Sequence, residues 1–282
     1  MERLDQVMKD QNLLQRVKDL CNSPKKKDSS IIYKMRKCPF NKCDGSGVIA
    51  SIDENGCTMA TFCKCREQII KKSKIKFADI PAEFKDLTIN SFRTDWYKTT
   101  EGKQKAIMAK KASVNFVKCY EDMKKKGKGL YLYSYAKGSG KTRMAASIGN
   151  ALVNALGVSV KFTTTTGLFD EIKATFDKGR EYTQSQLLDD IKRIETLILD
   201  DIGTEKPSTW VNEVLYGILN DRMTAKKVTI FTSNCSVEEL KHDDRIKNRI
   251  EKMTVPIPFP DESIRSYIAK SENENLQNML FE

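Results

Sequence analysis

The chain has 282 residues, 39% of them hydrophobic and 31% charged, which is enough to bury the core of one large domain or two smaller ones. Its net charge is +11, and the presence of a single histidine, beside eight cysteines, argues against a histidine-centred catalytic triad. No apolar run approaches the length of a membrane span and the first residues lack a signal-peptide core, so the composition predicts a cytoplasmic protein with no membrane partner.

The basic charge is concentrated toward the N-terminus. Residues 1–76 hold 17 lysines and arginines against 9 aspartates and glutamates, whereas residues 77–282 hold 32 against 29. This excess indicates an acidic partner such as nucleic acid, although a solvated lysine-rich surface would give the same count. Residues 1–22 carry apolar side chains at a spacing near 3.6, which predicts an amphipathic helix or helix pair that docks on a partner protein or on the cysteine-rich segment that follows.

Five of the eight cysteines fall between residues 38 and 65. Two close pairs flank a predicted β-hairpin at residues 48–62, and these pairs are Cys38 with Cys43 and Cys63 with Cys65. Four thiolates brought together by a hairpin in a cytosolic chain predict a structural Zn²⁺ site rather than disulfides. An iron–sulfur cluster and free thiols are the alternatives, and Cys57 either replaces a ligand or packs.

The segment after the cysteines marks the expected boundary between two domains. Residues 66–76 are basic and predict a helix, and Ile80-Pro81 predicts an extended entry into the next domain. The expected division is a small N-terminal module of residues 1–76 and a larger domain of residues 77–282. A single long helix is expected from residue 103 to residue 123.

The most informative stretch is a strand followed by a glycine-rich turn and a helix. The apolar run Leu130–Tyr133 leads to Gly138-Ser139-Gly140-Lys141-Thr142, and a helix is expected from there to Leu156, with Gly157 as its C-cap. Backbone amides of such a turn point at one anion, so the pattern predicts a phosphate-binding loop. Lys141 would contact the outer phosphates and Thr142 would bind Mg²⁺. The pattern departs from the consensus at Tyr135, where a glycine is expected.

Downstream of this loop, apolar runs alternate with amphipathic segments. Strands are expected at residues 158–163, 196–201, 228–234 and 255–259, and helices at 168–176, 187–191, 210–223, 244–250 and from 263, before a frayed polar end. This alternation predicts a doubly wound α/β domain. Asp200 and Asp201 end a buried strand, so they are expected at the carboxyl edge of the sheet, where such folds hold ligands.

The motifs from residue 80 to residue 270, with the cysteine module before them, resemble the bacterial and phage helicase loaders of the DnaC/DnaI type. These are AAA+ ATPases related to DnaA and to the IstB transposition helpers. The resemblance is carried by Ile80-Pro81 with Phe84, Leu130–Tyr133, Gly138–Thr142, Leu197–Gly203 with Trp210, Thr232–Asn234, Arg245–Arg249 and Ser263–Arg265. It implies an α/β fold in which an AAA+ P-loop parallel sheet is flanked by helices and preceded by a small cysteine-rich zinc-binding module.

The same resemblance implies which residues bind the nucleotide and its metal. The nucleotide-binding residues would be Gly138, Ser139, Gly140, Lys141, Thr142 and Arg143, with Lys141 on the β- and γ-phosphates. Mg²⁺ would be held by Thr142 and, through water, by Asp200. Asp201 would orient or deprotonate the attacking water, at a position where most AAA+ proteins have glutamate.

Four further residues resemble elements that sense the γ-phosphate. Asn234 resembles sensor 1, Arg249 resembles the arginine finger that reaches a neighbouring subunit, and Arg265 resembles sensor 2. Arg245 is the other candidate for the finger. Each arginine could instead form a surface ion pair, and Asn234 could instead cap a helix.

The implied function is ATP-dependent loading of a replicative hexameric DNA helicase in DNA replication. The chain would form a homo-oligomer in the ATP state, bind single-stranded DNA and hydrolyse ATP slowly at subunit interfaces, with ATP, Mg²⁺ and Zn²⁺ as cofactors. One alternative is an IstB-like transposition helper, which usually lacks a cysteine module. The other is a zinc nucleic-acid-binding protein whose degenerate ATPase serves as a nucleotide switch. A DnaA-like initiator would need a C-terminal duplex-reading domain, for which too few residues follow the last expected helix.

Overall fold

The structure is a computed structural model, and it describes residues 38–52, 58–175, 184–206 and 208–281. The helix or helix pair expected at residues 1–22, and Cys57, lie outside the described residues. The chain divides into two compact units, residues 1–65 and 66–282, and each is described by itself. The domain division expected after residue 76 stays a prediction. Within the described ranges, no helix is long and apolar enough to cross a membrane.

The first unit is built around an antiparallel hairpin of β1 (Val48–Ile52) and β2 (Thr58–Phe62). Gly47, with a φ of +82°, lies in the left-handed region that glycine adopts without strain, and it leads the chain into β1. The amide of Cys63 donates to the carbonyl of Gly47 at 2.9 Å. The hairpin therefore brings the segment before β1 next to the segment after β2, as the cysteine spacing predicts.

The second unit contains a parallel sheet with five strands in the described residues, in the order β4-β5-β6-β3-β7. The strands are β3 (Gly129–Tyr133), β4 (Val160–Thr164), β5 (Thr196–Ile202), β6 (Val228–Ser233) and β7 (Thr254–Pro258). The inner strands β5 and β6 are buried almost throughout, because parallel sheets are covered on both faces. All five strands run the same way, so their carboxyl ends meet at one edge.

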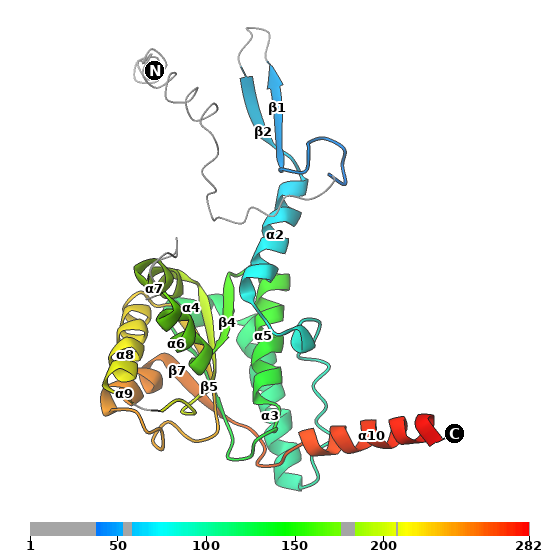
Figure 1. Cartoon of the computed structure of the whole chain (residues 1–282), viewed down its shortest axis with the longest axis vertical. Coiled ribbons are helices and arrows are strands. Elements are labelled where there is room, and N and C mark those ends of the chain that lie inside the picture. Colours follow the sequence, from blue (N-terminus) through cyan, green and yellow to red (C-terminus); the bar gives the residue numbers. More distant parts are fainter. Residues whose placement is uncertain (1–37, 53–57, 176–183, 207, 282) are drawn as a thin grey trace. The chain divides into compact units, whose positions relative to one another are not determined.

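Helices cover the two faces of this sheet (Figure 1). Against one face, α3 and α5 enclose a core that includes Ile148 and Leu152, and against the other α6, α8 and α9 enclose a core that includes Phe169 and Leu215. The helices are α2 (Cys65–Ala78), α3 (Thr100–Lys118), α4 (Tyr120–Lys126), α5 (Lys141–Leu156), α6 (Thr165–Ala174), α7 (Gln184–Arg193), α8 (Thr209–Thr224), α9 (Asp244–Met253) and α10 (Arg265–Phe281), with a 3-10 turn η2 (Ala82–Phe84). The expected α/β architecture is confirmed.

The helices differ from the expectation in two places. The single helix expected at residues 103–123 is two helices, α3 and α4, which meet at Cys119, where ψ is 22°. The end of the chain, expected to be frayed, forms α10 as far as Phe281. This stretch contains no glycine or proline to break a helix, and its glutamates and leucines favour one, so the polar composition does not prevent helix formation. The C-cap expected at Gly157 is confirmed by its φ of +65°.

A buried arginine ties α8 to the sheet and to the end of α7. Arg222 is 0% exposed and donates to the carbonyls of Ile191, Ile194 and Val228 and to the hydroxyl of Thr229. The carbonyls of Ile191 and Ile194 belong to the last turn of α7 and the residues after it, where helix carbonyls lack internal partners. The guanidinium satisfies several acceptors at once, which fixes α7 against α8.

We expect Arg222→Met to lower the free energy of unfolding by about 3 kcal/mol, because the apolar chain leaves these buried acceptors without donors. Urea unfolding followed by tryptophan fluorescence measures this, since both tryptophans, Trp96 and Trp210, lie in the second unit. The control is Arg193→Met, whose side chain is 82% exposed and should change stability by less than about 0.5 kcal/mol. Equal unfolding free energies for the two variants would contradict the role given to Arg222.

Candidate functional site

The turn between β3 and α5 has the backbone of a phosphate-binding loop. Gly138 and Gly140 have φ values of +78° and +90°, so both need the freedom of glycine. Tyr135, which stands where the consensus has glycine, is not among the residues with positive φ. Its side chain is exposed, and a glycine is therefore not required at this position.

Two segments far away in sequence, at Tyr97 and at residues 261–264, hold this loop. The hydroxyl of Tyr97 donates to the carbonyl of Ser139 at 2.8 Å, and the amide of Ile264 donates to the carbonyl of Gly138 at 3.0 Å. The carboxylate of Asp261 accepts from the amide of Tyr135 at 2.8 Å. The bond from Asp261 holds the first turn of the loop at Tyr135, where the consensus has glycine, and the other two hold the glycine-rich part.

The side chain of Lys141 points back into the loop. Its ammonium donates to the carbonyl of Ala136 at 3.1 Å, to the hydroxyl of Ser139 at 3.2 Å and to the carbonyl of Ser134 at 3.4 Å. Burial lowers the pKa of Lys141, although the nearby carboxylates of Asp200 and Asp201 oppose this. A desolvated cation beside two glycines of left-handed backbone fits the phosphates of a nucleotide.

Strand β5 departs from regular pairing where its two acids lie. Leu199 pairs with Phe231 of β6, and the next pair is Ile202 with Ser233. Three residues along β5 therefore lie opposite two along β6, which is a β-bulge. Consecutive side chains of a regular strand point to opposite faces, and a bulge changes this alternation. Asp201 accordingly has a φ of +59°. Both Asp200 and Asp201 are close enough to Lys141 to influence its pKa.

The carboxylate of Asp200 joins β5 to the phosphate loop and to β6. It accepts from the hydroxyl of Thr232 at 2.6 Å and from that of Thr142 at 3.3 Å. The side chain is 6% exposed, and burial raises the pKa of Asp200 even though both hydroxyls favour the anion. A hydroxyl and a carboxylate beside a phosphate loop are the protein groups that hold Mg²⁺ in P-loop proteins, so Thr142 and Asp200 fit this ion.

Asp201 and Asn234 form a second pair at the same sheet edge. The amide nitrogen of Asn234 donates to the carboxylate of Asp201 at 2.7 Å. Residues 235–243 are all described and form turns and bends, so Asn234 does not cap a helix there. Burial raises the pKa of Asp201, which Lys141 opposes and Glu205 reinforces. A carboxylate of raised pKa, oriented by an amide, suits the handling of a proton.

The four predicted arginines divide into two groups. Arg265 is exposed, and its Cβ lies next to Gly138, so it belongs to the phosphate-loop side. Arg143 follows the loop, but its guanidinium donates to the carbonyl of Ser91 at 2.9 Å. On α9, Arg245 and Arg249 both stack on the ring of Tyr216 of α8.

Arg249 is held by neutral partners on α8. It donates to the hydroxyl of Tyr216 at 2.7 Å and to the amide oxygen of Asn220 at 3.2 Å. Arg245 bonds to Asp243 at 2.9 Å, as a surface ion pair. Among the described residues, Arg245 therefore forms an ion pair with a carboxylate and Arg249 does not.

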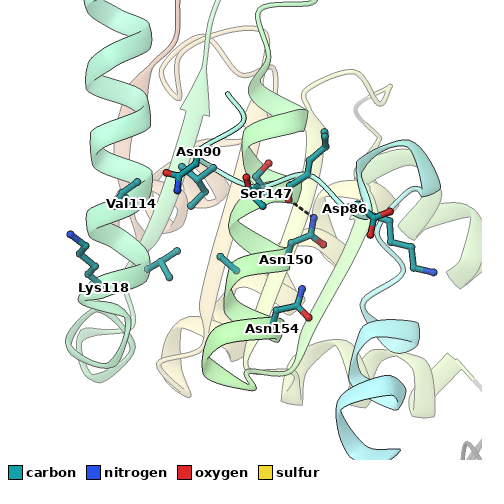
Figure 2. A pocket seen from close by; sticks show the side chains of 13 residues that line it. Asp86, Asn90, Val114, Lys118, Ser147, Asn150 and Asn154 are labelled. Atoms are coloured by element: carbon teal, nitrogen blue, oxygen red, sulfur yellow. Dashed lines mark hydrogen bonds between the residues drawn. The ribbon is translucent and has the colours of Figure 1, made fainter. Parts of the chain in front are cut away.

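A separate cavity of 470 Å³ lies between residues 85–90, α3 and α5 (Figure 2). Asn150 of α5 donates to the carbonyls of Phe84 and Leu87 at 2.8 and 2.9 Å and so fixes the wall made by that segment. None of residues 138–143 lines this cavity. The loop and the sheet edge, rather than the cavity, therefore form the candidate nucleotide site.

The first unit contains a compact cluster of four thiols. The sulfurs of Cys38, Cys43, Cys63 and Cys65 all lie within 4.8 Å of one another. Cys38 and Cys63 are 3.7 Å apart and Cys43 and Cys65 are 3.3 Å apart, distances too long for disulfides. A tetrahedral zinc site with Zn–S bonds near 2.3 Å has sulfur–sulfur edges of about 3.8 Å, so the four positions fit Zn²⁺.

The electrostatics of the cluster also favour a cation. Burial disfavours the Cys38 thiolate, yet backbone amides at residues 40, 42 and 43 outweigh it and lower the pKa of Cys38 to about 6. Burial raises the pKa of Cys65, and the neighbouring thiols raise it further. Four such thiols cannot ionise together without a positive charge among them, and a metal ion supplies that charge.

Comparison with known proteins identifies the family. A family model described as IstB-like ATP binding protein matches residues 63–246. The chain belongs to the IstB-like ATP-binding protein family. It is also 29% identical to a protein whose solved structure is titled as the crystal structure of the DnaI, with a TM-score of 0.53 over 67% of this chain and 98% of that one. The predicted AAA+ fold and the predicted relationship to the DnaC/DnaI type are confirmed.

Two similar proteins of Bacillus subtilis are a helicase loader and a protein of a phage-like element. The replicative helicase loader DnaI of Bacillus subtilis is 37% identical over 142 residues, which are 50% of this chain and 44% of that protein. The phage-like element PBSX protein XkdC of the same organism is 26% identical over 241 residues, or 83% of this chain and 84% of that protein. The chain therefore matches less than half of the length of the DnaI relative.

Sequence reasoning missed the roles of several side chains that shape the site. Thr232 belongs to the motif Thr232–Asn234, but the sequence assigned it no role, whereas in the structure it binds both the carboxylate of Asp200 and the amide of Asp201. Asp261 and Tyr97 form hydrogen bonds with the loop from more than 40 residues away in the sequence, and no local sequence pattern predicts these contacts.

We expect the purified chain to contain about one zinc ion, and Cys43→Ser to lose it, because a hydroxyl is a poor substitute for a thiolate ligand. Metal analysis by mass spectrometry measures the content, and a visible absorption band would reveal an iron–sulfur cluster instead. Cys119→Ser is the matched control, since this exposed thiol lies outside the cluster. Equal zinc in the two variants, or a metal-free wild-type chain, would contradict the assignment.

Proposed function

We propose that the protein is an ATP-dependent loader of a replicative hexameric DNA helicase. The observation that carries the proposal is the joint arrangement of Lys141, Thr142 and Asp200 with the pair Asp201–Asn234 at one sheet edge. The names of the relatives support the helicase as partner, since the matching DnaI of Bacillus subtilis is called a replicative helicase loader. A cytoplasmic site of action and homo-oligomerisation in the ATP state belong to the same proposal.

Within one subunit, one set of residues binds the nucleotide and another acts in its hydrolysis. Lys141 exchanges its carbonyl partners for the β- and γ-phosphates, and the amides of residues 138–142 complete the cradle. Thr142 and Asp200 would hold Mg²⁺, which would neutralise phosphate charge. Asp201 then accepts a proton from the attacking water or orients it, and Asn234 keeps that carboxylate in place. Aspartate is shorter than the glutamate usual in AAA+ proteins, so hydrolysis is slow.

The second half of the site comes from a neighbouring subunit. Arg249 is packed on Tyr216 with neutral hydrogen-bond partners, so its charge remains available to an anion delivered by another copy. Arg265 lies beside Gly138 and acts in the same subunit. ATP bound between subunits makes assembly depend on the nucleotide, which is how a loader would release the helicase after hydrolysis.

The two expected domains divide the remaining tasks. Residues 1–76, with the thiol cluster, contact the helicase, and residues 77–282 bind the nucleotide. Lysines and arginines of the oligomer contact the backbone of single-stranded DNA, so this binding weakens with salt. Zn²⁺ at Cys38, Cys43, Cys63 and Cys65 holds the hairpin of the module together.

An IstB-like transposition helper is the second candidate, because the matching family model carries that description. The two functions share an ATPase core and differ in the partner. Transfer of a helicase onto DNA separates them, since a transposition helper has no reason to perform it. A pure nucleotide switch would bind ATP without turning it over, and ATP hydrolysis stimulated by single-stranded DNA excludes it.

The test is helicase loading onto a closed single-stranded circle by the full chain, with ATP hydrolysis measured in parallel. We expect Lys141→Ala and Arg249→Ala each to lose at least about 10-fold in both readouts, because one removes nucleotide binding and the other the trans-acting charge. An equimolar mixture should recover part of the activity, since some interfaces then pair an intact loop with an intact arginine.

Arg193→Ala, which removes an exposed arginine of α7, is the control and should behave as wild type. No recovery in the mixture at any ratio would contradict a shared site. A wild-type chain that hydrolyses ATP but never loads the helicase would contradict the loader function and leave the ATPase standing.

A further inference from the structure

A buried polar pair lies behind the sheet edge and is used by none of the steps above. His242, the single histidine of the chain, has its Nε2 2.6 Å from a carboxylate oxygen of Glu205. The two side chains are 1% and 4% exposed. The other ring nitrogen, Nδ1, is 2.9 Å from the amide oxygen of Asn212 on α8. Charged side chains are seldom buried this completely unless a specific arrangement holds them.

Glu205 uses its second oxygen to hold the backbone that follows the catalytic candidates. This oxygen accepts from the amide of Gly203 at 2.9 Å. Gly203 has a φ of +93° and comes two residues after Asp201, whose own φ of +59° is unusual for an L-residue. The carbonyl of Asp201 is in turn bound by the hydroxyl of Thr204 at 2.8 Å.

At the bulge, side chains therefore form hydrogen bonds that in a regular strand would come from the backbone of neighbouring strands. Thr232 binds the amide of Asp201, Ser233 binds the carbonyl of Ile202, and Glu205 binds the amide of Gly203. Of these three, Glu205 is the one held by a buried side chain outside β5 and β6, His242. His242 is therefore the support of the carboxylate that holds the amide of Gly203, two residues after Asp201.

The opposite end of the pair reaches the helix that carries the candidate arginine finger. His242 directly precedes Asp243, whose carboxylate accepts from the amide of Ile246 and caps the N-terminus of α9. Asn212 comes from α8, the helix on which Arg249 is stacked. One hydrogen-bonded pair thus links the bulge at Asp201 to the start of α9.

We propose that Glu205 and His242 are positioning residues for the hydrolysis step, fixing the carboxylate of Asp201 through Gly203 and the start of α9 through Asp243. The inference rests on the proposed ATPase function and adds two residues to it. Both act through others and touch no nucleotide, so they contribute to turnover and not to affinity. A merely structural pair would instead affect folding, nucleotide binding and turnover together.

The experiment measures ATP hydrolysis and the affinity for a fluorescent ATP analogue in full-length variants. Glu205→Ala and His242→Ala should lower kcat about 30-fold or more, because a displacement of about 1 Å at the reacting group costs on the order of 100-fold. The KM for ATP and the analogue affinity should stay within about twofold, since the phosphate loop is unchanged. Glu205→Gln keeps the length and an oxygen for Gly203, so it should keep most of the wild-type kcat.

Lys241→Ala is the matched control, because this exposed residue adjoins His242. A kcat at the wild-type level in Glu205→Ala overturns the inference and leaves the proposed function intact. Parallel loss of kcat and affinity in both alanine variants also overturns it, in favour of a structural role. A wild-type chain that does not hydrolyse ATP fails the proposed function itself, and the inference falls with it.

A second readout does not depend on activity. Because the chain has one histidine, a sample labelled with ¹⁵N-histidine and free of tags gives a single imidazole signal. The Nε2 proton should exchange slowly with water in the wild type and rapidly in Glu205→Ala, which can no longer accept it. Rapid exchange in the wild-type chain would overturn the pairing of His242 with Glu205.

Discussion

The buried carboxylate of Asp200 is the interaction on which the candidate site depends. It joins three elements, because Thr142 lies in the first turn of α5, Thr232 belongs to β6 and Asp200 itself belongs to β5. The position is costly, since burial raises the pKa of Asp200 above its ordinary value. The folded chain then binds a proton more tightly than the unfolded one, so this group reduces stability as the pH rises from the unfolded pKa through the folded one, and the loss persists at neutral pH. A divalent cation would reverse that loss.

The bulge in β5 explains how two adjacent acids serve one site. In an unbroken strand Asp200 and Asp201 would point to opposite faces. The additional residue re-aims them, so that Asp200 reaches Thr142 while Asp201 reaches Asn234. Side chains of Thr232, Ser233, Thr204 and Glu205 replace the missing ladder bonds. The strain at Asp201 is therefore held by its surroundings, as is common where chemistry is expected.

Local patterns were enough to predict the framework of the protein. The apolar runs of β3, β5 and β6 and the glycines at 138 and 140 specify a parallel sheet with a phosphate loop, because burial and left-handed backbone leave a direct trace in residue type. The cysteine spacing likewise predicted the cluster of four sulfurs.

Contacts between distant residues could not be predicted in the same way. In the sequence, Tyr135 departs from the consensus of the loop. The residue that holds the backbone at this position is Asp261, which lies 126 residues away. The bulge was also invisible, since two acids after an apolar run look like the simple end of a strand. Glu205 and His242 are ordinary surface residues by type, and only the fold shows that both are buried.

The central claim is that Asp200 is kept buried and charged for a magnesium nucleotide, and thermal unfolding of Asp200→Asn tests it most directly. Without nucleotide, the neutral side chain should raise the unfolding midpoint at pH 7 by about 3 °C, because the desolvated charge is gone. Magnesium ATP should raise the wild-type midpoint by several degrees and leave the variant nearly unchanged. The exposed Asp170→Asn of α6 serves as the control. A lower midpoint without nucleotide, together with an undiminished response to magnesium ATP, would contradict the account.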